Sequence, residues 1–343
     1  MTQALLERGT GFLVPVVIAF AVSAVILLGI GENPIDVFGL MISEAFGSSR
    51  RLASTLSAAT PLLFTAAATA LCFRAGVFNV GVDGAFIVAG LAAVVAGFSL
   101  PAELGWLLVP ICMGVAAVFG AIWLYVPGWL LAKLDVDEVV STLMLNFVAV
   151  AITGYLVNGP FLSEISGNNV TPRVHEGAQL ARLMPPSTLH AGFLLGLAVL
   201  AVYAWWIRHT PQGLEGALVG LNRRFARAGG ISVSGAIILA MVLSGVVAGL
   251  GGAAHGLGQL QRFTDGFSAG YGFTGMAVAL LGRNHPVGIL FGAILFGALA
   301  SAGTTIQLFS DIPLDLVNII QGVVMIFAVV ELGRLALLRR ARP

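Results

Sequence analysis

The stretch Gly105–Leu131 reads GWLLVPICMGVAAVFGAIWLYVPGWLL and contains no Asp, Glu, Lys, Arg or His. A transmembrane helix needs about 20 predominantly apolar residues to cross a hydrocarbon core of about 30 Å. This stretch is longer than that requirement and carries no charge anywhere along it. It therefore predicts a helix that spans a membrane.

The composition of the whole chain indicates the same class of protein. Of 343 residues, 58% are hydrophobic and only 10% are charged, and the mean hydropathy is +0.98. Soluble domains carry about 25% charged residues. The few charged side chains present could not cover a soluble surface of this size, so lipid must be the main solvent.

Apolar runs recur along the chain and predict an all-α, polytopic membrane protein with about ten crossings. The run 273–283 is too short to span alone and follows the glycine-rich stretch 255–272, which predicts a re-entrant or broken helix near 255–283. We expect a single transmembrane domain over residues 1–343. The runs are 11–31, 52–73, 84–100, 105–131, 139–157, 190–207, 233–254, 273–283, 286–308 and 314–336.

The arginines predict the orientation, because cytoplasmic loops carry an excess of Lys and Arg. Most of the 17 basic residues fall on one side when both termini are placed inside, so we expect N-in and C-in. The loop 158–188, rich in Gly, Pro and Asn, then lies on the external, periplasmic side of the membrane. The arginine-rich loop 208–231 lies in the cytoplasm.

Several function classes are disfavoured by what the sequence lacks. The net charge of +1 gives no basic field for nucleic acid. The single lysine, Lys133, follows Leu131 and Ala132, so no G-K-[ST] phosphate loop exists. Cys72 and Cys112 lie in apolar runs without metal-ligand spacing, and no hydrolase motif is present. We expect no metal site and no enzymatic activity.

The cytoplasmic loop contains a predicted amphipathic helix over Gly216–Ala228, in which Leu218, Leu221 and Phe225 recur at helical spacing. Gly229 and Gly230 supply its end. Two interpretations fit these residues. The helix could lie on anionic lipid, or it could be a coupling helix that docks into a groove on a soluble motor.

Four motifs carry a resemblance to a known family. The spacing Gly220-Leu221-Asn222, then Ala226, then Gly230-Ile231 resembles the coupling segment of ABC importer permeases of the branched-chain amino acid and ribose type. The family's second-helix signature is similar to FRAGVFNVGVDG at 73–84. Two runs resemble its nucleoside-type branch: DEVVSTLMLN at 137–146 and GFTGMAVALLGRNHP at 272–286. The usual Glu, Asn and Pro are replaced by Asp83, Asp137 and Arg223.

The resemblance implies a multi-pass permease in the inner membrane of a bacterium, one of two different permease subunits of an ABC importer. Its partners would be the second permease, a cytoplasmic ATPase with two nucleotide-binding halves, and a substrate-binding lipoprotein. ATP and Mg²⁺ would be used by the ATPase, and this chain would bind no cofactor. The substrates would be nucleosides, with simple sugars such as ribose as the alternative. The coupling residues would be Gly220, Asn222, Arg224, Ala226, Gly230 and Ile231.

Uncharged polar residues inside the apolar runs are candidates for the substrate pathway, because a neutral, hydroxyl-rich solute needs hydrogen-bonding groups rather than a charged clamp. The alternative is that they bridge helices as polar contacts. Asn79 adds a break between two crossings, where unwound backbone could face a cavity. The candidates are Asn79, Asp83, Thr142, Asn146, Gln307, Asn318 and Gln321.

Two acidic residues, Asp83 and Glu138, lie near the predicted cytoplasmic ends of their helices. Asp83 could face a positive helix N-terminus or pair with Arg74, and Glu138 could pair with Lys133 or a loop arginine. No carboxylate or histidine lies in the middle of a predicted helix, which argues against proton coupling. A secondary transporter is therefore the less favoured alternative to an ATP-driven importer.

Overall fold

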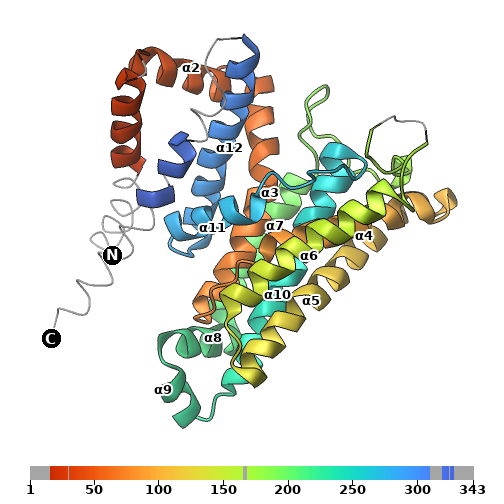
Figure 1. Ribbon diagram of the computed structural model, residues 1–343, viewed down its shortest axis with the longest axis vertical. Coiled ribbons are helices and arrows are strands. Elements are labelled where there is room, and N and C mark those ends of the chain that lie inside the picture. Colours follow the sequence, from red (N-terminus) through yellow and green to blue (C-terminus); the bar gives the residue numbers. More distant parts are fainter. Residues whose placement is uncertain (1–15, 30, 165–167, 310–318, 324, 328–343) are drawn as a thin grey trace.

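The computed structural model describes residues 16–29, 31–164, 168–309, 319–323 and 325–327, without the side chains of 305–309 (Figure 1). The described part is helical and contains no β-strand, only the isolated bridges Val170↔Thr264 and Arg182↔His190. The expectation of an all-α protein is confirmed.

In this part of the chain, seven helices are long and apolar enough to cross a membrane. The helix Val16–Gly29 and α11 (Tyr271–Leu281) are apolar but shorter, and most of the predicted run 314–336 lies outside the described residues. The break expected near 255–283 is present as a π-helix, His255–Leu260, followed by the 11-residue α11. The seven are α3 (Ser49–Arg74), α4 (Val82–Ser99), α5 (Leu108–Leu134), α6 (Glu138–Asn158), α7 (Gly192–His209), α10 (Val233–Ala254) and α12 (Pro286–Phe309).

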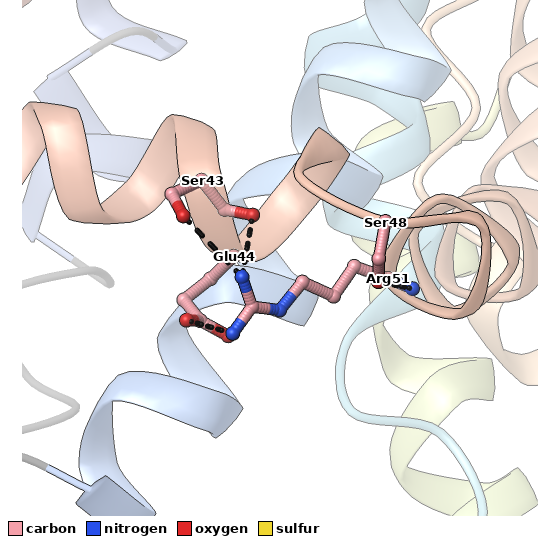
Figure 2. A network of polar contacts seen from close by, with 4 residues as sticks. All are labelled: Ser43, Glu44, Ser48 and Arg51. Atoms are coloured by element: carbon pink, nitrogen blue, oxygen red, sulfur yellow. Dashed lines mark hydrogen bonds and ion pairs between the residues drawn. The ribbon is translucent and has the colours of Figure 1, made fainter.

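A helix that the apolar runs do not predict, α2 (Pro34–Phe46), precedes α3. Asn33 caps its N-terminus and Pro34 occupies its first position, where proline is compatible with a helix. Its 13 residues are too few to span a membrane, so the length of apolar runs does not predict it. Figure 2 shows how the corner to α3 is fixed: the Arg51 guanidinium lies 2.6 Å from the Glu44 carboxylate and also donates to Ser43.

The helices α5 and α10 pack closely against each other. An added Cβ on Gly120 would collide with the carbonyl oxygen of Gly245, and an added Cβ on Gly249 would collide with that of Ala116. Lipid tails are as apolar as leucine, so helices in a membrane associate largely through such close contact of small residues. Gly245 and Gly249, spaced as G-x-x-x-G, therefore allow α10 to approach α5 closely.

The substitution Gly120→Leu should therefore destabilise the fold, by about 3 kcal/mol or more, because backbone on both sides cannot move aside. The expected result is loss of monodisperse protein on heating in detergent, measured by size-exclusion chromatography. Gly114→Leu in the same helix is the matched control, since no atom lies within 4 Å of an added Cβ there. Equal stability of the two variants would contradict the packing described here.

The two ends of the bundle carry different structures (Figure 1). The helices α8 (Pro211–Leu221) and α9 (Arg223–Ala228) project together from one end, below α10. The long connection between α6 and α7 lies at the other end, with a 3-10 turn at Glu176–Ala178. The loops predicted on opposite sides of the membrane thus lie at opposite ends of the bundle.

Candidate functional site

A non-helical connecting segment, Ala75–Gly81, separates α3 from α4 and confirms the predicted break between these helices. The chain turns at Gly76, whose φ of +69° favours glycine. The rings of Phe73 and Phe78 then stack at 5.2 Å. Backbone that leaves a helix inside a membrane must find its hydrogen-bond partners within the protein.

Two side chains of α6 supply those partners. The Val80 amide donates to Thr142 Oγ1 at 3.2 Å, and the Asn146 side-chain amide donates to the Val80 carbonyl at 3.0 Å. Asn146 Oδ1 also accepts from the Gly84 amide at 2.9 Å, in the first turn of α4. Thr142 and Asn146 thus hold the connecting segment along the first turns of α6.

Asn79 ties the same segment to α10. Its side-chain amide donates to Ser244 Oγ at 3.1 Å, and its Oδ1 accepts from the Gly81 amide at 2.9 Å. The side chains of Asn79 and Thr142 are fully buried, and Asn146 is 7% exposed. These three predicted pathway residues are therefore brought together, with polar atoms engaged in holding the backbone.

Asp83 faces the N-terminus of α11. Its Oδ1 accepts from Ser268 Oγ at 2.7 Å and from the Gly272 amide at 2.8 Å. A carboxylate is stabilised at this position because the first amides of a helix are unpaired and the helix dipole is positive there. Of the two alternatives for Asp83, the structure thus favours the helix N-terminus, and in the described residues no ion pair joins it to Arg74.

Asp83 lies in the first turn of α4, so it is at an end of its helix as predicted; that this end is cytoplasmic stays a prediction. The connecting segment runs along α6 from Glu138, which accepts from the Phe78 amide at 3.4 Å, to Asn146. At 1.5 Å per residue, that rise amounts to about 12 Å. Asp83 therefore lies inside the bundle, and Glu138 contacts the segment rather than Lys133.

The remaining pathway candidates lie elsewhere. Gln321 is half-buried near the C-terminal end of the described chain. Asn318 and the side chain of Gln307 lie outside the described part. For all seven candidates, direct contact with a substrate stays a prediction.

An apolar crevice of about 660 Å³ lies between α3, α5, α7 and α10. Its lining includes Phe64, Met113 and Leu250, and the hydroxyl of Tyr203 is already donated to the Asn284 carbonyl at 2.8 Å. This crevice offers a hydroxyl-rich solute almost no hydrogen-bonding group. It is a poor candidate for a substrate site.

The helices α8 and α9 form a hairpin over Pro211–Ala228, which we call the coupling hairpin after its predicted role, where a single helix was predicted over Gly216–Ala228. The predicted single helix is divided at Asn222, whose extended backbone ends α8. Its Oδ1 then accepts from the amides of Arg224 and Phe225, at 2.9 and 3.0 Å, and so caps α9. Asparagine is among the best N-cap residues, so the break follows from this one residue.

Most residues of the predicted coupling motif build the hairpin. Gly220 lies against the backbone of Arg74 and Gly76, and Ala226 is fully buried. The chain leaves α9 through Gly230, with φ +81°, while the amide of Ile231 donates to the Ala226 carbonyl. This is the arrangement of a Schellman cap, in which glycine takes the left-handed position.

The residues that point away from the bundle form the outer face of the hairpin: Leu221, Arg224 and Phe225. Leu221 is 83% exposed and Phe225 is 65% exposed. The arginines Arg223 and Arg227 are exposed beside them. The helical spacing predicted one apolar group of Leu218, Leu221 and Phe225. Leu218 is half-buried, whereas Leu221 and Phe225 face outward.

Two departures from the family pattern have a local explanation. Arg223 occupies the first position of α9, where proline is also favoured, and its guanidinium donates to the Gly76 carbonyl at 3.3 Å. Asp137 caps α6 by accepting from the Val140 amide at 2.9 Å, a role that Asp and Asn perform equally well.

Comparison with known proteins yields relatives along nearly the whole chain. The nucleoside ABC transporter permease protein NupB of Lactococcus lactis is 33% identical over 93% of this chain and 90% of its own length. The glucose ABC transporter permease protein TsgB13 of Haloferax volcanii is 34% identical over 92% and 85%. The guanosine ABC transporter permease protein NupP of Bacillus subtilis is 31% identical over 92% and 91%.

The relatives also come in pairs, since the Lactococcus lactis permease NupC and the Bacillus subtilis permease NupQ each match at 28% identity. No solved structure matches. Residues 51–329 match the family described as the branched-chain amino acid transport system / permease component. The chain therefore belongs to this family of membrane permeases.

Proposed function

We propose that this chain is a permease subunit of an ATP-driven ABC importer that takes up nucleosides by alternating access. The nucleoside assignment is supported by the names of NupB and NupP, which align with the chain over almost its full length. The importer assignment is supported by the exposed hairpin at one end of the bundle.

The outer face of the coupling hairpin is the observation that carries this proposal. Leaving two large apolar side chains in water forgoes about 1.5–3 kcal/mol for each, which a partner would recover. Two apolar anchors on a short helical hairpin suit a groove on a soluble protein. Because Arg223, Arg224 and Arg227 surround the anchors, the groove should have an acidic rim.

The partners of this chain follow from the same proposal. A second, different permease completes a heterodimer, a cytoplasmic ATPase with two nucleotide-binding halves takes the hairpin, and a lipoprotein delivers the substrate outside. ATP and Mg²⁺ are used by the ATPase, so this chain is not an enzyme and binds no cofactor. The importer lies in the inner membrane of a bacterium.

The membrane topology is part of the proposal. The chain crosses about ten times, with both termini on the cytoplasmic side of the membrane, to which the hairpin is also assigned, in keeping with the excess of arginine on that side. Asn79, Thr142 and Asn146 hold the unwound backbone beside the pathway. Substrate passes where such broken helices meet, as in other transporters.

Uptake of labelled guanosine and uridine tests the function. Cells that carry the complete importer should accumulate both, and deletion of this chain alone should reduce uptake to background. Excess unlabelled nucleoside should compete, whereas glucose, ribose and leucine should not. Because TsgB13 is named for glucose, competition by glucose or ribose alone would replace nucleosides with sugars as the substrate.

A further inference from the structure

The connecting segment touches the coupling hairpin at its first residues. Gly220 of α8 is in backbone contact with Arg74 and Gly76, and an added Cβ on Gly76 would lie 2.9 Å from the Gly220 Cα. The Arg223 guanidinium adds a hydrogen bond to the Gly76 carbonyl. Because no side chain separates the two backbones, neither can move toward the other. We call such a direct backbone contact a joint.

The middle of the segment is held by hydrogen bonds to two helices. Val80 is bonded through both its amide and its carbonyl to α6, and Asn79 is bonded to α10. These groups are buried, and breaking such bonds inside a protein is costly because no water replaces them. The segment is therefore joined to the first turns of α6 and, through the bond of Asn146 to the Gly84 amide, to the first turn of α4, and it moves together with them.

Directly after the segment, the first turn of α4 makes a second joint of the same kind. Asp83 is bonded to Ser268 and Gly272, and an added Cβ on Gly272 would collide with the backbone of Asp83. Gly272 lies in the first turn of α11, which is too short to span the membrane. In other transporters, the ends of discontinuous helices line substrate sites near the middle of the membrane.

We propose that Gly76, Gly220 and Asp83 are positioning residues that carry a displacement of the coupling hairpin to the N-terminus of α11. The connecting segment is the rigid strut between the two joints. This inference rests on the proposed function, because it requires an ATPase that moves the hairpin. It goes beyond that function in naming where the motion enters the bundle and where it arrives.

A cysteine reporter at Ala269 tests the strut. Ala269 is exposed and follows Ser268 directly, while the native Cys72 and Cys112 are buried. The complete importer with Ala269→Cys is placed in nanodiscs, and its rate of maleimide labelling is compared between ADP and ATP with vanadate. We expect a change of at least threefold in the parent complex and less than 1.5-fold in Gly220→Ala.

Gly216→Ala, in the same helix, should keep the full response, because an added Cβ there has no neighbour within 4 Å. Asp83→Ala should lose the response without touching the hairpin, and it decides the matter if Gly220→Ala fails to assemble. A full response in Gly220→Ala or Asp83→Ala would overturn the proposal, as would no response in the parent. Co-purification and ATP hydrolysis of the parent separately test the importer itself.

Discussion

The double variant Leu221→Asp/Phe225→Asp should no longer bind the ATPase subunit, and essentially all nucleoside uptake should be lost as a result. Each anchor of an interface typically contributes about 2 kcal/mol or more, so removing both weakens binding about 1000-fold. Both side chains are exposed, at 83% and 65%, so the change costs the fold of the chain little. The measurement is co-purification of the ATPase with a tagged permease, together with nucleoside uptake.

The same experiment separates docking on a protein from docking on lipid. If the hairpin lies on anionic lipid, the aspartates should leave the ATPase bound and reduce only membrane contact. Trp106→Asp is the matched control, because Trp106 is 78% exposed and lies in the turn directly before α5, at the end of the bundle that is far from the hairpin. An ATPase that remains bound to the double variant would refute the role of the outer face.

The helical class was predictable because the physics of the bilayer acts on single segments. A run such as Gly105–Leu131 has no stable alternative to a spanning helix, so composition and length suffice. The short helix α2 has no such constraint, and its 13 residues became visible only in the structure. The spacing of Gly245 and Gly249 in α10 indicates close helix contact for a related reason, because small residues four apart let two membrane helices approach each other.

The arrangement of the candidate site was harder to predict, because it depends on contacts between distant residues. Asn146 and Thr142 were identified from their polarity, yet their bonds to Val80 join residues far apart in the chain. The partner of Asp83 was left open for the same reason. The coupling motif was found as a pattern, but the backbone contact of Gly220 shows that it builds the hairpin.

Substitution of Asp83 by alanine should reduce uptake about 100-fold while the importer still assembles. The side chain accepts from Ser268 Oγ and from the Gly272 amide, and its loss takes this acceptor from the buried amide and from the half-buried hydroxyl. Each unpaired buried group costs about 1–3 kcal/mol. This cost destabilises the position of α11, which must be restored in every transport cycle. Nucleoside uptake should therefore fall although the importer still assembles.

Asp83→Asn separates the hydrogen bonds from the charge. An amide oxygen still accepts from both donors, so only the interaction of the charge with the helix N-terminus is lost, about 0.3–1 kcal/mol in exposed sites and up to about 2 kcal/mol when partly buried. Uptake should then fall about tenfold or less. Asp265→Ala in the same loop is the control, since Asp265 is exposed and its side chain accepts from the amide of its neighbour Gly266, while its backbone bond to Asn169 is kept. Should Asp83→Ala and Asp265→Ala transport equally well, Asp83 does not position α11.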